Sequence, residues 1–482
     1  MTERKNPDLE QALARPENSL QQAIAHCLQA QSIRLVVLDD DPTGIQTVHG
    51  CLLITHWDPS TLREAFRHSA PFFYLLTNTR ALTRAQAAEV TRSAMEAVLA
   101  ANREFSYRLV FISRSDSTLR GHFPLETDVM KQVLAEHRQA VFPIDCFVPA
   151  FLEAGRYTLD GIHYLKNGEE LVPVAQTEFA RDNVFAYHHS KLHDYLAEKL
   201  GRTDFEYVSL DKSFQELTPD GRDAFGRELL ARAAQAANGF YLTVDTRDYA
   251  DLRRFALALL HWTAGRDEAV VIRSSSSLPK ALSGIADVGL LGKEQILGTS
   301  SANTDGACQK PKGLFIVGSH VRKTTEQLEC LLACPGTEGI EVSVGDVLER
   351  PDDYRPAVLE RIAKAAAAGR LPVVYTSRQE IRLDNADARQ RLGQDVSDFL
   401  VSLVPRLPFR PAWLVAKGGI TSHDILTKGL GVKKATVMGQ ILSGVPCLRT
   451  GADAVLPHLP YIIFPGNVGN ASALKEVFEK LR

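Results

Sequence analysis

The sequence contains none of the features that mark a membrane-spanning or nucleic-acid-binding protein. No apolar run approaches the ~18 residues that a membrane-spanning helix needs. The net charge of -3 is spread along 482 residues, with no basic block and no stripe of basic and aromatic residues, so nothing favours a nucleic-acid partner. The opening stretch MTERKNPDLE is polar and lacks the apolar core of a signal peptide. We therefore expect a cytoplasmic protein without a membrane partner.

The cysteine and histidine patterns contain no recognisable metal or redox motif. The seven cysteines are scattered, and none has the short paired spacing of a zinc ribbon or a redox site. Cys330 and Cys334 would share a helix face, which buried thiols in a reducing compartment explain. His189 and His193 have metal-compatible spacing on a predicted helix, but no third ligand is nearby, so we interpret them as part of a solvated helix face. Metal ligands are therefore left unassigned.

The length and the order of the elements predict two α/β domains. A chain of 482 residues is too long for one hydrophobic core. Short apolar strands alternate with amphipathic helices, which indicates two three-layer α/β/α domains with largely parallel sheets. The polar, almost aperiodic stretch LGKEQILGTSSANTDGACQKPK predicts a linker. The predicted boundaries are an N-terminal extension over 1–30, a first domain over 31–295, a linker over 296–312 and a second domain over 313–482.

The predicted strands lead into polar or glycine-bearing turns. Because the carboxyl ends of parallel strands meet at one edge of a sheet, these turns are expected to form a ligand-binding edge in each domain. The predicted strands are Leu35–Leu38, Phe72–Leu76, Leu109–Ile112, Phe240–Val244 and Ala269–Ile272 in the first domain, and Leu314–Val317, Val373–Thr376, Trp413–Ala416 and Tyr461–Phe464 in the second.

Three strands of the second domain end in glycine-bearing turns that precede helices. Glycine lets the backbone approach a phosphate closely, and a helix N-terminus favours an anion, so together these turns predict a nucleotide site. One such turn alone would be ordinary strand–helix chemistry. Thr324 with Gln327, and Thr421 with Asp424, have the spacing of helix capping boxes, whereas neither a P-loop nor a dinucleotide fingerprint is complete. The candidate turn residues are Gly318, Ser319, Gly418, Gly419, Thr421, Gly466, Asn467 and Gly469.

The strand ends of the first domain carry carboxylates and arginines instead. The apolar run Ile33–Leu38 leads directly into Asp39–Asp41 and a Pro-Thr-Gly turn. An arginine can hold a substrate carboxylate bidentately, and an aspartate beside a hydroxyl can act as a general base. The residues therefore predict a site for a polyol or a sugar acid, while structural ion pairs and a solvated corner are the alternative. The other strand ends supply Arg80, Arg114, Asp116, Ser117, Thr118, Arg120 and Arg156.

From about Ile33 onward the sequence resembles the four-carbon acid sugar kinase family. The matching segments are Asp40-Asp41-Pro42-Thr43-Gly44, Asp116-Ser117-Thr118-Leu119-Arg120-Gly121 with Glu126 downstream, Pro149-Ala150-Phe151 with Gly155-Arg156, and the loops Gly318-Ser319, Gly418-Gly419-Ile420-Thr421-Ser422 and Gly466-Asn467-Val468-Gly469. This family includes ATP-dependent kinases of threonate, erythronate and 3-oxo-tetronate. The resemblance implies an acid-sugar-binding first domain, an ATP-binding second domain and catalysis in a cleft between them, with Mg²⁺ expected alongside ATP.

The chain departs from the family pattern at two places. Pro42 stands where an aromatic residue is more usual, which bears on the identity of the acid sugar. Phe464-Pro465 precede the last glycine loop, where a lysine is common. Lys417 could take over the neutralisation of the ATP phosphates, so it joins the predicted nucleotide-binding residues together with Ile420 and Ser422.

These observations favour phosphoryl transfer from ATP to a hydroxyl of a small sugar acid. Asp41 is the first candidate for the general base and Asp116 the second. Two alternatives stay open: a non-catalytic sensor that binds nucleotide and sugar acid, and another transferase or lyase that turns over without ATP. The sugar acid, its reacting hydroxyl, the Mg²⁺ ligands and a homo-oligomeric state are left open. The predicted substrate-binding residues are Asp40, Thr43, Gly44, Arg80, Arg114, Ser117, Arg120 and Arg156.

Overall fold

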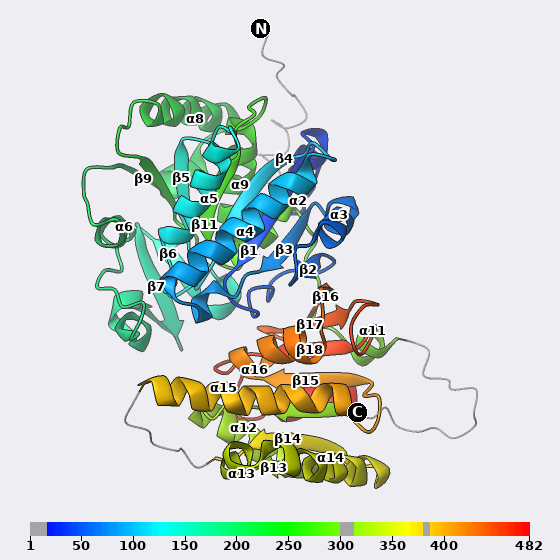
Figure 1. Cartoon of the computed structure of the whole chain (residues 1–482). Coiled ribbons are helices and arrows are strands. Elements are labelled where there is room, and N and C mark those ends of the chain that lie inside the picture. Colours follow the sequence, from blue (N-terminus) through cyan, green and yellow to red (C-terminus); the bar gives the residue numbers. More distant parts are fainter. Residues whose placement is uncertain (1–16, 299–312, 379–385) are drawn as a thin grey trace. The chain divides into compact units, whose positions relative to one another are not determined.

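The computed structural model describes residues 17–298, 313–378 and 386–482. The chain divides between Asp287 and Val288 into two compact units, of which the first is coloured blue to green and the second green to red in Figure 1. Most of the predicted linker lies outside the described residues. None of the described helices is long and apolar enough to cross a membrane.

The first unit is built on a parallel sheet, as the alternation of strands and helices predicts. Neighbouring strands pair in parallel throughout this sheet. Most of its strands are buried along their whole length, as in parallel sheets covered on both faces. The strand order is β2 (Leu52–Ile54), β3 (Phe72–Leu76), β1 (Ile33–Asp39), β4 (Arg108–Arg114), β11 (Val270–Ser274), β5 (Ile144–Val148), β10 (Phe240–Val244) and β9 (Glu206–Leu210).

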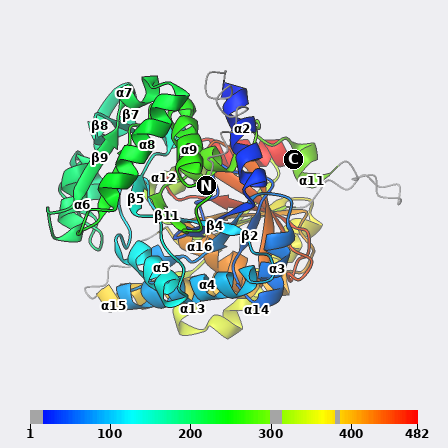
Figure 2. The same cartoon turned by 90° about the horizontal axis from the view of Figure 1, so that it is seen from above.

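Helices cover this sheet in two groups (Figure 2). In one group, α3 (Pro59–Arg67), α4 (Arg84–Asn102) and α5 (Leu125–Glu136) pack onto a core that includes Val36 and Phe73. In the other group, α2, α9 and α10 pack together. The predicted N-terminal extension therefore contains a helix that packs within the first unit. The remaining helix bounds are α2 (Glu17–Ala30), α6 (Leu192–Leu200), α7 (Lys212–Glu216), α8 (Pro219–Ala233), α9 (Tyr249–Trp262) and α10 (Ser277–Ser283).

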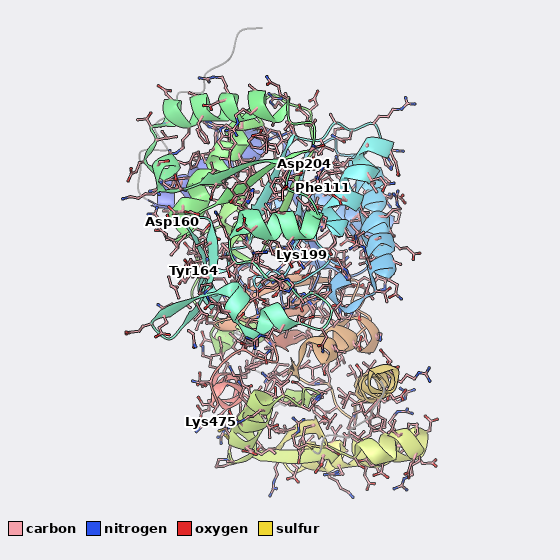
Figure 3. The ribbon with its side chains drawn as sticks, turned by 90° about the vertical axis from the view of Figure 1, so that its left-hand side faces the viewer. Phe111, Asp160, Tyr164, Lys199, Asp204 and Lys475 are labelled. Atoms are coloured by element: carbon pink, nitrogen blue, oxygen red, sulfur yellow. The ribbon has the colours of Figure 1, made fainter. Side chains whose placement is uncertain are left out.

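A small antiparallel sheet, which the sequence analysis does not anticipate, is inserted after β5. It consists of β6 (Arg156–Leu159), β7 (Ile162–Asn167) and β8 (Glu170–Pro173). Asp160 in the β6–β7 turn and Tyr164 in β7 are labelled in Figure 3. Reciprocal backbone hydrogen bonds between Thr158 and Thr246 tie β6 to the loop after β10. This insertion places Arg156 at the start of β6.

The second unit has a mixed sheet. Its first five strands in spatial order are parallel, as predicted, whereas β17 and β16 form an antiparallel hairpin that the sequence analysis misses. Gly444, with φ of 76°, supplies the positive φ that the short turn of this hairpin requires. The strand order is β13 (Thr337–Val342), β14 (Leu371–Thr376), β12 (Gly313–Val317), β15 (Trp413–Lys417), β18 (Pro460–Phe464), β17 (Val445–Thr450) and β16 (Lys434–Leu442).

The core of the second unit lies between this sheet and the helices α12 and α17. Buried Phe315, Trp413 and Phe464 from the strands pack with Leu328 of α12 and Leu474 of α17. On α17, the apolar stripe of Leu474, Val477, Phe478 and Leu481 is buried. The helix bounds are α11 (Lys293–Leu297), α12 (Arg322–Leu332), α13 (Val344–Glu349), α14 (Pro351–Ala367), α15 (Ala386–Leu403), α16 (Gly419–Asp424) and α17 (Ala473–Leu481).

Candidate functional sites at two strand edges

Each sheet has a point at which the chain changes the direction in which it adds strands. In the first unit, β3 and β2 lie on one side of β1 and β4 lies on the other. In the second unit, β14 and β13 lie on one side of β12 and β15 lies on the other. Ligands of open α/β sheets bind beyond the carboxyl ends of the strands at such switch points. The strand register places Asp39 beside Arg114 and Val317 beside Lys417, so residues of both predicted sites meet there.

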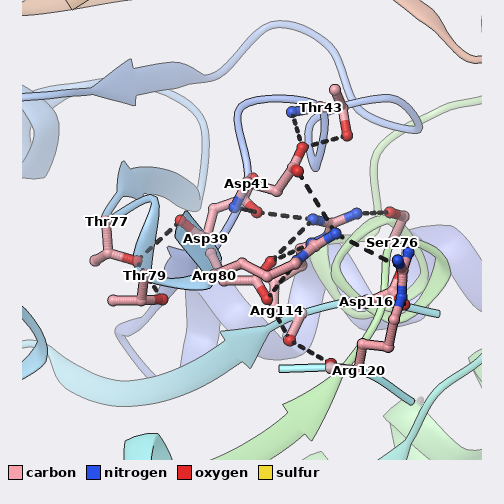
Figure 4. A network of polar contacts seen from close by, with 12 residues as sticks. Asp39, Asp41, Thr43, Thr77, Thr79, Arg80, Arg114, Asp116, Arg120 and Ser276 are labelled. Carbon is pink, nitrogen blue, oxygen red and sulfur yellow. Dashed lines mark hydrogen bonds and ion pairs between the residues drawn. The ribbon is translucent and has the colours of Figure 1, made fainter. Parts of the chain in front are cut away.

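Figure 4 shows the polar contacts of the first cluster, among them those of Asp39, Arg80 and Arg114. Asp40 is the buried centre of this cluster. It is 2% exposed, and Arg80 binds it bidentately through Nε at 3.1 Å and Nη2 at 2.5 Å. The Ser115 hydroxyl donates a further hydrogen bond to Asp40 Oδ2, and Arg114 Nη1 lies 3.5 Å from Oδ1. Asp40 therefore has three protein partners and is held inside the protein.

Asp39 completes the buried layer and explains why glycine stands at position 44. Arg114 Nη1 donates to Asp39 Oδ1 at 3.0 Å, while Arg114 Nη2 donates to Ser276 Oγ at 2.9 Å. Burial raises the pKa of Asp39 to about 7, against the opposing effect of Arg114. A Cβ atom at Gly44 would lie 2.1 Å from Asp39 Oδ2, so any larger residue would displace this carboxylate. Gly44 thus packs against Asp39.

Asp41 differs from its two neighbours because it reaches the surface. Its side chain is 22% exposed, and Arg80 Nη1 lies 3.5 Å from Asp41 Oδ2. The backbone N–H of Thr43 donates to Asp41 Oδ1 at 2.8 Å, and the Thr43 hydroxyl donates to the same oxygen. Burial would raise the pKa of Asp41, but Arg80, Arg114 and the Thr43 hydrogen bonds lower it below its usual value. Asp41 is therefore ionised at neutral pH, with one oxygen fixed by the turn.

Asp116 brings a third strand end to the same arginine. Its Oδ1 lies 3.7 Å from Arg80 Nη1, and its Oδ2 accepts from Arg120 Nε at 2.8 Å and from the Thr118 hydroxyl. Although burial would raise it, Arg80 and Arg120 hold the pKa of Asp116 well below its usual range. Arg120 also lies 3.4 Å from Asp182. The structure thus brings Asp40, Asp41 and Asp116 together around Arg80.

The loop that carries Asp116 is held by buried side chains that the sequence analysis does not identify. Each of them donates a hydrogen bond to a backbone carbonyl of the loop. Leu119, with φ of 66°, adopts a left-handed conformation that is unfavourable for a branched side chain, so the loop depends on these bonds. The three bonds are His163 Nε2 to Ser117 (2.8 Å), Tyr195 Oη to Leu119 (2.8 Å) and Arg273 Nη2 to Arg120 (3.3 Å).

Two of the buried groups near this loop have altered ionisation. Burial lowers the pKa of His163 to about 4, so the ring is neutral, with Nε2–H donating to the loop and Nδ1 accepting from the Thr158 hydroxyl at 3.0 Å. Burial, reinforced by Asp40, raises the pKa of Glu126 to about 7. Thr79 Oγ1 donates to Glu126 Oε1 at 2.5 Å, and Oε2 has no hydrogen-bond partner among the described residues. No local sequence pattern signals these roles, because the partners come from distant elements.

In the second unit, the last glycine loop is held by its carbonyl groups. Gln327 Nε2 donates to the carbonyls of Val468 at 3.0 Å and Asn470 at 2.8 Å. Thr324 Oγ1 lies 3.1 Å from Ser319 Oγ and 3.4 Å from the Gly466 carbonyl oxygen. Two of the three loops are therefore linked by side chains of α12.

These contacts correct the predicted capping boxes. Helix α12 begins at Arg322, so Thr324 lies inside its first turn, and its hydroxyl reaches the neighbouring loops instead of capping the helix. Helix α16 begins at Gly419, which places Thr421 inside the helix as well. Asp424 accepts from Ser397 Oγ at 2.6 Å. In both cases tertiary contacts use the side chains whose spacing predicts local caps.

Lys417 is buried beneath the same loop. Its Nζ donates to the carbonyls of Pro465 at 2.7 Å and Gly466 at 3.1 Å and lies 4.2 Å from the centre of the Phe464 ring. The structure describes no carboxylate that forms an ion pair with Lys417 within residues 17–298, 313–378 and 386–482. Burial, reinforced by nearby Lys323, lowers the pKa of Lys417 to about 7.

Close packing explains part of the glycine pattern. A Cβ atom at Gly318 would lie 2.1 Å from Thr421 Oγ1, and Gly418 has φ of 116°, which side chains rarely adopt. At Gly419, by contrast, a Cβ atom would meet nothing within 4 Å, and the adjacent Ile420 is 68% exposed. The turn at Gly419 therefore faces open space.

The remaining predicted residues take different positions in the second cluster. The N–H groups of Gly318 and Ser319 both donate to the Lys417 carbonyl, at 3.2 and 3.3 Å, and Ser422 Oγ donates to the Ala416 carbonyl at 2.8 Å. Arg378, which the sequence analysis misses, donates through Nη1 to the Ser319 carbonyl at 2.7 Å. Lys323 Nζ donates to the Asn467 carbonyl at 3.2 Å. The three predicted loops are thus one hydrogen-bonded cluster.

No metal site is assigned. Among the described residues, no group of three or more histidines, cysteines, aspartates and glutamates is arranged to hold a metal ion. His188 and His189 precede α6, which begins at Leu192, so the prediction that His189 shares a helix with His193 is wrong. His189 Nε2 instead lies 4.0 Å from Glu198.

The fold and the two strand-edge clusters define a class of two-domain α/β proteins with one polar, charge-rich site and one glycine-rich site. A family model described as a sugar-binding N-terminal domain matches residues 35–282, and one described as a nucleotide-binding C-terminal domain matches residues 314–474. The first match alone spans more than half of the chain. The protein therefore belongs to the family that joins a sugar-binding N-terminal domain to a nucleotide-binding C-terminal domain.

Solved structures share this fold. A Haemophilus influenzae protein of the DUF1537 family is 15% identical, with a TM-score of 0.61 over 93% of this chain and 100% of that one. A Salmonella typhimurium LT2 protein that carries the provisional name tRNA synthase is 17% identical, with a TM-score of 0.65 over 93% of this chain and 99% of that one. No curated protein matches the chain.

Proposed function

We propose that the protein is an ATP-dependent kinase that phosphorylates a hydroxyl of a small sugar acid such as a tetronate. The family supplies the coarse basis, because a sugar-binding and a nucleotide-binding domain lie in one chain. The observation that carries the proposal is the state of Asp41, an ionised and partly exposed carboxylate at the switch point of the sugar-binding domain. A carboxylate in this state can accept the proton of a substrate hydroxyl.

In the proposed reaction, Asp41 is the general base. It takes the proton from the substrate hydroxyl as the hydroxyl oxygen bonds to the γ-phosphorus of ATP and the bond from that phosphorus to the ADP oxygen breaks. Thr43 fixes Asp41 Oδ1, while Oδ2 beside Arg80 is the oxygen that would face the hydroxyl. Asp116 is less exposed than Asp41, at 12% against 22%, and both of its oxygens lie near arginines, so we assign it a positioning role.

The other residues of the first cluster divide by accessibility. Arg114 is 4% exposed and bonded to Asp39 and Ser276, so we propose that it positions the aspartates. Asp40 and Gly44 are assigned to the same supporting layer. Thr43, Arg80, Ser117, Arg120 and Arg156 remain the proposed contacts to the sugar acid.

The second cluster would bind the nucleotide phosphates. Gly419 and Ile420, the first two residues of α16, leave space for a phosphate to approach the backbone. Gly318, Ser319, Gly418, Thr421, Ser422, Gly466, Asn467 and Gly469 would shape this site. Lys417 would hold the last loop through its carbonyls and add positive charge beneath it. Mg²⁺ would enter with the ATP phosphates, and no protein ligand is assigned to it.

The test is ADP release by the full-length protein with MgATP and a panel of four- and five-carbon sugar acids. We expect at least one tetronate to stimulate ADP release well above the rate without acid. If both ATP and a sugar acid stabilise the protein but no ADP is released, the kinase proposal is wrong and the protein is a non-catalytic sensor. If the acid is converted in the absence of ATP, the kinase proposal is wrong and the protein is a different transferase or a lyase.

A further inference from the structure

The arginines of the first domain's candidate site differ in whether they already form an ion pair with a carboxylate of the protein. Arg80 lies within 4 Å of Asp40, Asp41 and Asp116, and Arg114 within 4 Å of Asp39 and Asp40. Arg120 is paired with Asp116 and Asp182. These three guanidinium groups are therefore committed to holding the protein's own carboxylates.

Arg156 is the exception. Within the described parts of the chain it forms no ion pair, and its one side-chain hydrogen bond runs from Nη1 to the Ala154 carbonyl. Its Nε is buried and has no hydrogen-bond partner among the described residues. A guanidinium has five N–H donors in a rigid fork, so most of the donors of Arg156 remain available. A partly buried cation in this state is costly unless an anion meets it.

Hydrogen bonds place the strand that begins with Arg156 beside the candidate substrate loop. Thr158 of the same strand bonds His163 Nδ1 at 3.0 Å, and His163 Nε2 donates to the Ser117 carbonyl of that loop at 2.8 Å. Burial lowers the pKa of Arg156, and Asp116 opposes this effect while Arg120 adds to it. Neither pairs with it directly. Arg273 also forms no ion pair within the described ranges, but it is 2% exposed and donates to the carbonyls of Ser274 and Arg120, which leaves Arg156 as the accessible candidate.

The loop that carries Arg156 is firmly held. Glu153 accepts hydrogen bonds from Tyr249 Oη at 2.6 Å, Ser277 Oγ at 3.2 Å and Lys280 Nζ at 3.3 Å. The Leu152 N–H donates to Ser277 Oγ at 2.9 Å. The guanidinium is therefore attached to a backbone that is fixed before any ligand arrives, which lowers the entropic cost of binding.

We infer that Arg156 is the receptor for the carboxylate of the sugar ligand and so selects sugar acids over neutral polyols of the same length. The inference rests on the proposed function for its ligand class but not on catalysis. The planar carboxylate suits the fork of a guanidinium, which can form two parallel hydrogen bonds to it. The paired arginines could offer this geometry only by releasing their aspartates.

The experiment is isothermal titration of the full-length protein with threonate and with threitol, both in the absence of nucleotide. We expect the wild-type protein to prefer the acid, R156M to bind threonate about 10- to 100-fold more weakly with unchanged threitol binding, and R156K to be intermediate. R181M, at an exposed arginine of the same unit, is the matched control and should behave like the wild type. Thermal unfolding checks that each variant is folded. If R156M is not folded, the comparison of R156K with the wild type tests the inference.

Three outcomes would overturn the inference. Unchanged threonate binding by R156M together with a lower kcat would assign Arg156 to the transferring phosphoryl group. Equal weakening of threonate and threitol binding in a folded variant would make the residue structural. If a tetritol phosphate binds more tightly than threonate, the group that Arg156 binds is a phosphate and not a carboxylate. Because no nucleotide is present, failure of the kinase proposal would leave these titrations unaffected, and a kinase without acid preference would refute this inference alone.

Discussion

The two strand-edge clusters occupy equivalent places in their sheets but consist of different kinds of residues. The first contains aspartates and arginines that form ion pairs with one another, with Asp40 at 2% exposed between Arg80, Arg114 and Ser115. The second contains glycines and hydroxyls around Lys417, a buried cation that binds backbone carbonyls. The same topology therefore supports charge supplied by side chains in one unit and polarity supplied largely by the backbone in the other.

This difference suits the two proposed ligands. A small polyol acid needs directional side-chain partners at fixed positions, and ion pairs among the protein's own groups hold those partners before binding. Phosphates need close approach to backbone N–H groups, which glycine permits. Substitutions that are matched across the two clusters test this difference.

The largest expected effect contrasts the two buried charges. D40N leaves Arg80 and Arg114 without their shared partner and should lower the free energy of unfolding by about 3–5 kcal/mol. K417M removes a buried cation that has no paired carboxylate among the described residues, so its effect should stay within about 1 kcal/mol of zero. Urea denaturation measures both. Equal losses would show that the clusters do not differ in this respect.

The second effect separates chemistry from support within the first cluster. D41N should lower kcat at least ~10²-fold if Asp41 is the general base. Its stability should fall by less than about 1 kcal/mol, because the group is partly exposed and lies 3.5 Å from Arg80. Steady-state ADP release and urea denaturation give the two values. Near-normal turnover in D41N, with turnover lost in a folded D116N protein, would transfer the role to Asp116.

The third effect concerns two glycines of the second cluster. G318A introduces a Cβ atom 2.1 Å from Thr421 Oγ1 and should cost about 1–3 kcal/mol of stability. G419A places its methyl group in open space, so stability should be retained while nucleotide binding weakens, because the methyl group occupies the approach to the backbone. Calorimetric titration with ATP tests this. Wild-type affinity in G419A would remove Gly419 from the phosphate site.

The fourth effect is a pH dependence of opposite sign in the two units. The pKa of Glu126 is about 7 in the folded protein against an ordinary 4.5, so the folded state binds this proton more tightly and stability falls as pH rises from about 5 to 7. The pKa of Lys417 is about 7 against an ordinary 10.5, so the unfolded state binds this proton more tightly and stability rises with pH from about 7 to 10.

Melting temperatures across pH 5–10 test both signs. The difference between E126Q and wild type should change mainly below pH 7, and the difference between K417M and wild type mainly above it. If the melting temperature changes with pH equally in wild type and variant, the pKa of the group does not differ between the folded and unfolded states. A reversed slope would contradict the assigned direction.

The sequence alone is enough to predict the buried parallel strands and the residues that meet at their carboxyl ends, but not the antiparallel hairpin of β16 and β17 or the small sheet of β6, β7 and β8. Continuous apolar runs such as Phe72–Leu76 and Trp413–Ala416 predict buried parallel strands, and the structure confirms them. Because parallel strands align their carboxyl ends, the residues that follow them had to meet at one edge. This is why Asp39–Asp41, Arg80 and Asp116 could be grouped without coordinates.

The sequence does not show which members of each cluster are bound by other protein groups and which remain available to a ligand, because this depends on the folded arrangement. Arg114 and Arg156 cannot be told apart from the sequence, but in the structure Arg114 binds buried aspartates and Arg156 binds no carboxylate among the described residues. His163 supports the Asp116 loop from a strand 47 positions away from Asp116 in the chain, which no local pattern encodes. The physical reason is that hydrogen bonds and ion pairs depend on distances across the fold, whereas local spacing determines only helix turns and strand faces.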